Sequence, residues 1–422
     1  MIRASTIAAV ALCLSAPLHA QSQQTAIRFG SLVDGTGRVL RDAVVVTNAD
    51  TIVSVGTGTS AVPRGARVID LRRYTGIPGM IDAHTHITYY WDGAAGSDPW
   101  RQGGQRRPQV TVFLAQENAR RTLETGVTTI RDLGASDYSD LAIRDLINRG
   151  AMVGPRVFAA GYGLRRAPAQ TQPNALPGPP RGRLTSVDDV AAAVKAQVDA
   201  GVDVIKVYGS TGSGADVTGR QTLTFDEMKA IVDAAHALKH KVAIHSYGPS
   251  GVKDAVRAGA DSIEHGIDPD DDTIAEMARR GIVWVPTIDH NRYYVDAKDE
   301  FGFKPEAIPP LNDYIAKNLE STRRAVKAGV KLGMGSDAVY SMFGQNTREL
   351  EWFVKAGMTP AQALATATTI AAELLGKADT LGRLAPGFTA DIVAVEGRPL
   401  DDVHDVVRGM RWVMKDGVVV VK

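Results

Sequence analysis

The chain has 422 residues, of which 44% are hydrophobic and 23% are charged, and its formal net charge is +1. This composition is ordinary for a globular protein, and the balanced charge gives no reason to expect nucleic acid or an anionic membrane as a partner. The length fits one large domain accompanied by a smaller one.

Residues 1–20 are typical of a secretory signal peptide. Arg3 supplies the positive start, residues 6–14 form an apolar run too short to span a bilayer, and Ala20 precedes the expected cleavage point. Cys13 is the only cysteine, so the mature chain would have neither disulfides nor thiol chemistry. We therefore expect a periplasmic or secreted protein with no membrane attachment after signal removal.

Short β-forming runs separated by Gly, Asp and Asn turns occupy both ends of the chain. Neither set is long enough for a core of its own, so we expect residues 21–75 and 385–422 to pair into one small β-sandwich domain, with residues 76–384 inserted between them. The expected strands are 26–29, 43–46, 52–55, 67–71, 391–395, 406–414 and 418–421.

The middle of the chain alternates between strand and helix patterns. Eight strands with intervening helices predict an α/β fold, a (β/α)8 TIM-like barrel, with an open doubly wound sheet as the alternative. The expected strands are 77–87, 127–133, 156–161, 204–209, 242–247, 262–266, 283–288 and 331–337, and the expected helices are 110–124, 187–199, 225–239, 249–258, 270–280 and 311–328.

Three long irregular stretches follow strands, at residues 89–108, 164–184 and 289–310. Long loops in a compact domain are usually functional or disordered. We expect them to form the walls and lid of a substrate pocket, with surface insertions as the alternative.

Metal-capable or titratable side chains stand near the carboxyl ends of five expected strands. Each has an ordinary explanation by itself, such as a core histidine or a helix-capping Asp. In a parallel barrel these strand ends meet on one face, which is where active sites lie, so together they predict a metal site. They are His84, His86, Lys206, His245, His265 and Asp337.

Lys206 is unusual because it lies inside a run of Val and Ile. A buried lysine needs either an anionic partner or a lowered pKa. A neutral amine can react with carbon dioxide to give a carbamate, a carboxylate-like ligand able to bridge two divalent ions. The alternative is a buried lysine in a salt bridge.

The motifs together resemble the metal-dependent amidohydrolase superfamily. They are residues 78–86 (PGMIDAHTH), Lys206-Val207-Tyr208, His245, Glu264-His265-Gly266 and Gly335-Ser336-Asp337, and residues 384–393 resemble the return into that family's small β domain. The chain is most similar to the imidazolonepropionase-related branch, which contains Xaa-Pro dipeptidases and bacterial enzymes that hydrolyse ochratoxin A, an N-acyl phenylalanine.

The resemblance implies two divalent metal ions, zinc first, with manganese and cobalt as alternatives. His84 and His86, with Asp337, would hold the more buried ion, and His245 and His265 would hold the second. N6-carboxylated Lys206 would bridge the two. Asp337 would take a proton from the attacking water and pass it to the leaving amine, and Tyr208 would hold the substrate or the oxyanion.

One departure concerns the substrate. Relatives often carry a His after the third strand, whereas residues 160–164 contain none. We expect His290 to take a catalytic or substrate-binding role instead, and His290 or Arg292 to bind a substrate carboxylate.

The expected activity is hydrolysis of the amide bond in dipeptides or N-acyl amino acids with a free carboxylate, including ochratoxin A to ochratoxin alpha and phenylalanine. The alternatives are a cyclic-amide or lactone hydrolase or a deaminase of the same fold, and a non-catalytic metal-binding protein. The resemblance also implies a homo-oligomer, with an octamer among the expected forms.

Overall fold

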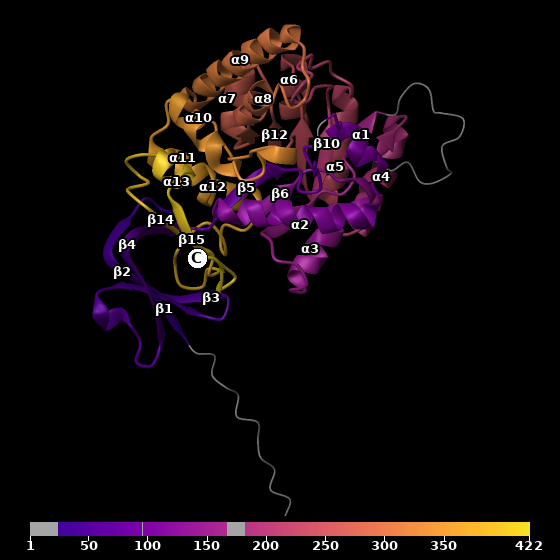
Figure 1. The fold of residues 1–422 in the computed structure, drawn as a ribbon. Helices are drawn as coiled ribbons and strands as arrows, with labels where there is room; N and C mark the ends of the chain where they lie inside the picture. The colour runs from indigo at the N-terminus through magenta and orange to yellow at the C-terminus, as the bar shows by residue number, and fades with distance from the viewer. Residues whose placement is uncertain (1–23, 95, 167–181) are drawn as a thin grey trace, which may run out of the picture.

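The structure is a computed structural model that describes residues 24–94, 96–166 and 182–422 (Figure 1). The expected signal peptide, residues 1–20, and much of the expected loop 164–184 lie outside these residues. The described chain forms a small β-sheet unit and a larger α/β unit above it in Figure 1.

Both ends of the chain build the small unit. Its seven-stranded sheet has the order β16-β15-β14-β4-β1-β2-β3, so strands from the two ends meet where β14 pairs antiparallel with β4. This confirms the predicted β domain. Its strands are β1 (Thr25–Val33), β2 (Val39–Asn48), β3 (Thr51–Thr57), β4 (Arg67–Pro78), β14 (Ile392–Val395), β15 (Met410–Lys415) and β16 (Val418–Val421).

Alternating side chains of these strands form a separate core that includes Phe29, Val45, Ile392 and Trp412. Two boundaries differ from expectation. Strand β4 continues to Pro78, and the strand expected from residue 406 begins only at Met410, because a short helix, α13 (His404–Val407), precedes it.

Parallel strands form the centre of the larger unit, in two ladders of order β5-β6-β7 and β10-β11-β12-β13. Neighbours in both ladders run parallel, as right-handed β-α-β crossovers require. The strands are β5 (Met80–Thr85), β6 (Val127–Asp132), β7 (Arg156–Ala159), β10 (Val204–Tyr208), β11 (Lys241–His245), β12 (Ser262–Glu264) and β13 (Val283–Val285).

Isolated parallel bridges join the two ladders into a closed barrel. Leu164 bridges Val207 on one side, and residues 331–338 close the other side through bridges from Leu332 to Trp284 and from Ala338 to Thr85. The expected eighth strand is therefore extended chain without a regular ladder. The Asp82 carboxylate accepts the Ser336 N–H at 2.9 Å, which takes that donor out of strand pairing. The predicted barrel fold is confirmed.

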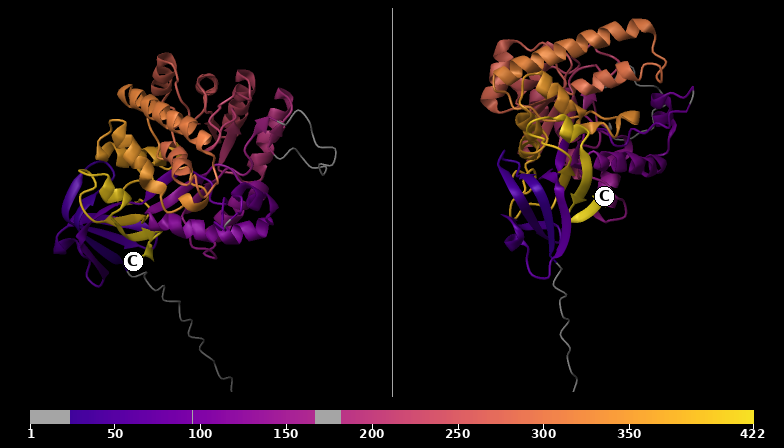
Figure 2. Two further views of the ribbon diagram at one scale, coloured as in Figure 1. Left: turned by 45° about the horizontal axis from the view of Figure 1, so that its top comes forward. Right: turned by 60° about the vertical axis from the view of Figure 1, so that its left-hand side comes forward.

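Helices lie around the outside of the barrel, with the small sheet to one side (Figure 2). Within the described residues, no helix is both long and apolar enough to cross a membrane. The helices are α1 (Pro99–Gln105), α2 (Pro108–Glu124), α3 (Ser139–Asn148), α4 (Val190–Asp199), α5 (Phe225–Ala237), α6 (Pro249–Ala258), α7 (Asp271–Arg280), α8 (Ile288–Asp296), α9 (Ile308–Lys327), α10 (Glu349–Lys355), α11 (Pro360–Thr366) and α12 (Thr369–Leu374).

The two units meet at the start of the barrel. Arg156 at the beginning of β7 forms ion pairs with Asp391 and Asp416 of the small unit. Gly79 separates β4 from β5, and a Cβ there would overlap Thr128 and stand 2.8 Å from the Asp391 Cβ. The sheet therefore continues directly into the strand that carries His84.

Candidate active site

The barrel brings the predicted ligands together at the carboxyl ends of its strands. His84 lies in β5, Lys206 in β10 and His245 at the end of β11, and His265 directly follows β12. Each predicted ligand, including His86 and Asp337, is buried. The arrangement follows from parallel strands, whose carboxyl ends share one face.

His84, His86 and Asp337 form the tightest group, with one ligand atom from each lying within 4.8 Å of the others. The His84 Nδ1–H donates to Glu264 at 2.7 Å, and the His86 Nδ1–H donates to the Gly134 carbonyl at 3.1 Å. Both Nε2 lone pairs therefore face Asp337 Oδ1, at 3.5 and 3.3 Å. Electron-rich atoms facing one another in this way fit a shared cation.

His245 and His265 lie beside this group. Their ring centroids are 4.5 Å apart, and the His265 ring is 5.1 Å from that of His84. His245 Nε2 is buried and has no hydrogen-bond partner within the described structure. A buried nitrogen without a partner is costly, and a second cation would satisfy it.

Lys206 is 1% exposed, and its Nζ lies 3.4 Å from His84 Nε2. Burial lowers the pKa of Lys206 to about 8, although Glu264 and Asp337 act in the opposite direction. Among the described residues no carboxylate lies within salt-bridge distance of this amine. The lowered pKa therefore fits the expected reactive amine better than the alternative of a salt-bridged lysine.

Two ligand positions have unusual backbone conformations. His265 (φ 66°) and Asp337 (φ 50°) lie in the left-handed region, which non-glycine residues rarely adopt. The His84 carbonyl accepts the Asp337 N–H at 2.7 Å, and the Val285 carbonyl accepts the His265 N–H at 2.9 Å. Neighbouring strands thus hold both side chains in directions that a relaxed backbone would not favour.

Arg131 and Glu264 support the ligands but were missed as functional residues by the sequence analysis. Arg131 is 1% exposed and donates to Glu264 at 2.8 Å and to the Ala83 carbonyl at 2.6 Å. Burial alone would raise the pKa of Glu264, but Arg131 and His84 hold it at about 2. Glu264 is therefore an anion that fixes the orientation of His84. A charged side chain inside an expected strand, similar to the signal used for Lys206, could have revealed Arg131.

An inner cavity of about 130 Å³ opens onto this centre. Tyr89 stacks on His86 at 4.7 Å, and Tyr247 packs against His265 at the same distance. The lining residues are His86, Tyr89, Tyr208, Gly212, Ser213, Gly214, His245, Tyr247, His265, His290, Tyr294, Asp337, Val339 and Tyr340.

Tyr208 is held in a fixed position within this lining. A Cβ on Gly163 would overlap its ring, and a Cβ on Gly134 would stand 3.1 Å from its hydroxyl and 3.9 Å from His86 Cε1. The hydroxyl therefore lies near His86, and the predicted role of Tyr208 in holding the substrate or the oxyanion stays a prediction.

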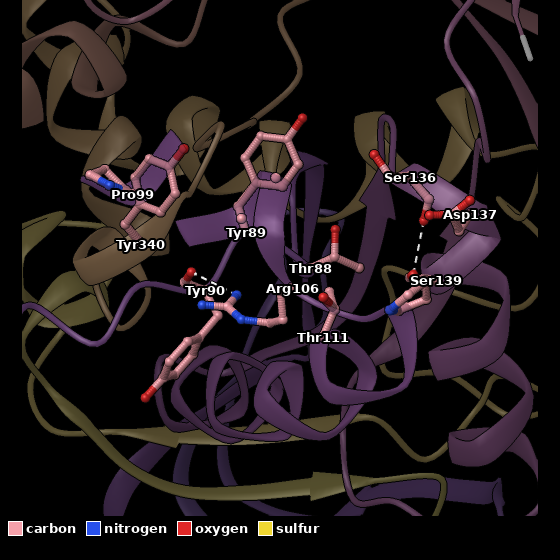
Figure 3. Close-up of a pocket in the computed structure, with 13 residues that line it drawn as sticks. Thr88, Tyr89, Tyr90, Pro99, Arg106, Thr111, Ser136, Asp137, Ser139 and Tyr340 are labelled. Atoms are coloured by element: carbon pink, nitrogen blue, oxygen red, sulfur yellow. Dashed lines mark hydrogen bonds between the residues drawn. The ribbon is translucent and has the colours of Figure 1, made fainter. Parts of the chain in front are cut away.

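A larger cavity, of about 330 Å³, is shown in Figure 3. Tyr89 and Tyr340 line both cavities. Figure 3 shows Thr88, Arg106 and Ser136 around the outer cavity, which is more polar than the inner one. The outer cavity provides room for a substrate larger than the inner cavity could contain.

His290 lies in the inner cavity, with its Nε2 3.2 Å from Asp337 Oδ2. Burial lowers its pKa, and Asp337 opposes that shift. His290 therefore contacts Asp337, the side chain that is expected to transfer protons. The catalytic or substrate-binding role predicted for His290 stays a prediction.

Arg292 is placed differently from the expectation that it contacts substrate. It does not line the inner cavity, and its guanidinium donates to Asp289 at 2.7 Å and to Asp296 at 2.5 Å. Residues 288–296 form helix α8 instead of part of an irregular loop. On a helix, i±3 and i±4 neighbours meet, which pairs Arg292 with the two acids, so its placement does not support the predicted substrate contact.

Comparison with known proteins agrees with this arrangement. The family description "Amidohydrolase family" matches residues 75–420. The chain is 29% identical to the ochratoxinase of Aspergillus niger over 412 residues, covering 91% of this chain and 83% of that protein. It is 25% identical to the imidazolonepropionase of Geobacillus thermodenitrificans over 361 residues, covering 78% and 76%.

Solved structures show the same relationship. A Xaa-Pro dipeptidase with methionine bound in its active site superposes with a TM-score of 0.86 and 30% identity, covering 95% of this chain and 100% of that one. The A. niger ochratoxinase superposes with a TM-score of 0.81 and 27% identity, covering 95% and 96%. A family match over most of the chain, on a barrel that carries this ligand set, shows that the protein belongs to the amidohydrolase family.

Proposed function

We propose that the protein is a binuclear metal-dependent hydrolase that cleaves the amide bond of dipeptides or N-acyl amino acids and releases an amino acid with a free carboxylate. One observation carries the proposal. The two Nε2 atoms of His84 and His86 face the Asp337 carboxylate, and unpartnered His245 Nε2 stands beside them.

The residues that would hold the ions follow from their positions. His84 and His86, with Asp337, would hold one, and His245 and His265 the other. Lys206, carboxylated on its amine, would bridge them, and zinc is the first expectation for these ligands. When bound, the ions would lower the pKa of a water molecule and polarise the amide carbonyl.

The protein's own side chains would manage the protons. Asp337 would accept a proton as water attacks the amide carbon, and would return it to the nitrogen as the C–N bond breaks. His290 Nε2 lies 3.2 Å from the second Asp337 oxygen, and this contact would keep the carboxylate turned toward the reaction. The Tyr208 hydroxyl, near His86, would hold the substrate carbonyl oxygen.

The substrate class is supported by two relatives. The first is an ochratoxinase, and ochratoxin A is an amide of phenylalanine. The second is a Xaa-Pro dipeptidase whose active site holds a free amino acid, methionine. Both names point to a substrate in which the nitrogen of an amino acid forms the amide bond, and we propose the same kind of substrate for this protein.

A cyclic-amide hydrolase is the second candidate, favoured by the similarity to an imidazolonepropionase. The two candidates differ in product, since opening a ring releases no separate amino acid.

Metal analysis combined with a substrate panel tests the proposal. The panel contains Xaa-Pro and other dipeptides, N-acyl amino acids including ochratoxin A, and cyclic amides, with amino acid release as the readout. We expect about two metal ions per chain and release of amino acid from the linear amides. Metal-loaded protein that hydrolyses no linear amide would contradict the proposal, with the Asp337→Asn variant as the inactive control.

We also propose that the protein is exported, on the strength of the signal-like residues 1–20, and that it assembles as a homo-oligomer. Amino-terminal sequencing of the protein from its native compartment, expected to begin after Ala20, tests the first point. Light scattering tests the second.

A further inference from the structure

Arg165 lies beside Tyr208, a lining residue of the inner cavity, in short strand β8 (Arg165–Arg166), which pairs with β9 (Arg183–Leu184). The preceding residue, Leu164, bridges Val207 of β10. The side chain is exposed, and its guanidinium carbon lies 4.4 Å from the centroid of the Tyr208 ring. Among the described residues, the guanidinium has no hydrogen bond or salt bridge.

The stacking on Tyr208 leaves the binding edge of the guanidinium free. A guanidinium that stacks on an aromatic ring contacts the ring through the flat face of the guanidinium. The N–H donors project from the edge of the guanidinium and match the two oxygens of a carboxylate. The Tyr208 ring packs so closely against the Gly163 backbone that a Cβ at position 163 would overlap the ring. The ring therefore has no room to move in that direction. Arg165 therefore rests on a fixed support.

The distance from Arg165 to the metal ligands suits an amino acid. The Tyr208 ring lies 5.3 Å from the His245 ring, so one aromatic ring separates Arg165 from the ligands. In a peptide, the α-carboxylate carbon lies about 4 Å from the carbonyl carbon of the scissile amide. Charge-assisted hydrogen bonds of about 2.8 Å would join that carboxylate to the guanidinium. A substrate whose scissile amide carbon lies beside the metal ligands would thus have its α-carboxylate within reach of Arg165.

The other arginines near the cavities are already engaged. Arg131 is buried against Glu264, and Arg292 is bound to two acids of its own helix. Arg106, beside the outer cavity, donates to the Tyr90 carbonyl and to Gln102. Of these described arginines, Arg165 is the one whose donors are free for a ligand.

We propose that Arg165 binds the free α-carboxylate of the substrate and so restricts the enzyme to amides of a carboxyl-terminal amino acid. The proposal rests on the proposed amide hydrolysis, and it adds the residue that distinguishes a free carboxylate from a blocked one.

The test compares two substrates that differ only in charge, N-benzoyl-phenylalanine and its carboxamide. Replacing Arg165 by Gln should lower kcat/KM for the acid by about 10- to 100-fold, the loss expected for hydrogen bonds to a charged group. The carboxamide should be affected less than about twofold, because it forms no ion pair with Arg165. Arg165→Lys should recover part of the loss.

Arg166→Gln is the matched control. The Arg166 guanidinium is bound to Glu227 and to the Thr185 carbonyl, so its loss should leave the ratio of acid to carboxamide unchanged. Equal losses for both substrates in Arg165→Gln, or no loss, would overturn the proposal.

A binding measurement separates this proposal from the proposed function. Calorimetry with phenylalanine and phenylalaninamide on the metal-loaded protein needs no turnover, and Arg165→Gln should weaken only phenylalanine binding. If phenylalanine binding depends on Arg165 but the wild-type protein hydrolyses no amide, the proposed amide hydrolysis is contradicted and the role of Arg165 is not. Binding of phenylalanine that does not depend on Arg165 would contradict the role of Arg165.

Discussion

Glu264→Gln tests whether the buried ion pair behind the ligands stabilises the fold. The wild-type carboxylate accepts hydrogen bonds from Arg131 at 2.8 Å, from Ser262 at 2.5 Å and from His84 at 2.7 Å. The substitution keeps the shape but removes the charge, leaving the Arg131 cation without its anion. Breaking a buried pair in this way typically costs about 3–5 kcal/mol.

The pKa of Glu264 gives a similar magnitude for the free energy by which this carboxylate stabilises the fold. The folded protein holds it at about 2, below the ordinary value of 4.5. At about 1.4 kcal/mol per pH unit, the difference corresponds to a stabilisation on the order of 3 kcal/mol. Because the folded pKa is the lower one, this stabilisation is present above pH 4.5 and is lost as the pH falls toward 2. Glu264→Gln should lack this part of the acid sensitivity.

Urea unfolding of the metal-free protein, followed by tryptophan fluorescence, measures the cost without interference from metal loss. The control is Glu276→Gln, since Glu276 also pairs with two arginines, Arg279 and Arg280, but at the surface. It should change the free energy of unfolding much less than Glu264→Gln does, because exposed ion pairs are screened by water. If Glu264→Gln were no more destabilising than this control, the reasoning would be wrong. Metal affinity, from competition with a chelator, should fall about 10- to 100-fold because His84 loses its anionic acceptor.

Further predictions concern the centre itself. Lys206→Ala should remove most of the bound metal and nearly all activity, and retention of two ions in metal analysis would contradict a bridging role. Asp337→Asn should lower kcat by about 10²- to 10⁴-fold while substrate binding remains measurable, and a near-normal rate would exclude it as the acid–base group. Gly163→Ala should displace the Tyr208 ring and lower kcat/KM by about 100-fold with an unchanged circular dichroism spectrum. Chelation should abolish activity, and added zinc should restore it.

The ligand positions could be predicted because they depend on a simple rule of topology. Parallel strands in a barrel end on one face, so a His or Lys near the end of each expected strand must approach the others. The pairing of the two chain ends was predictable for a similar reason, since neither set of short strands could bury a core alone.

The remaining features depend on contacts between residues distant in sequence. The irregular eighth strand results from Asp82 capturing the Ser336 amide, two residues that nothing in the sequence connects. The helix at residues 288–296 was not predicted because its mixture of aromatic and polar residues gave no clear helical period. The position of Arg165 beside the site could not be predicted, because it depends on the contact between its guanidinium and the Tyr208 ring.

The pairing of β4 with β14 has a consequence for the order in which the chain can fold. Thr75–Pro78 is hydrogen-bonded to Ile392–Val395, roughly 300 residues later in the chain, and such distant contacts form slowly. During synthesis β1–β4 can pair early, but the free edge of β4 stays open until almost the whole barrel has emerged. An open strand edge is prone to pair with other chains. Strand β14 therefore protects the β4 edge against aggregation, and loss of β14 should reduce the yield of soluble protein even though every metal-ligand residue would remain.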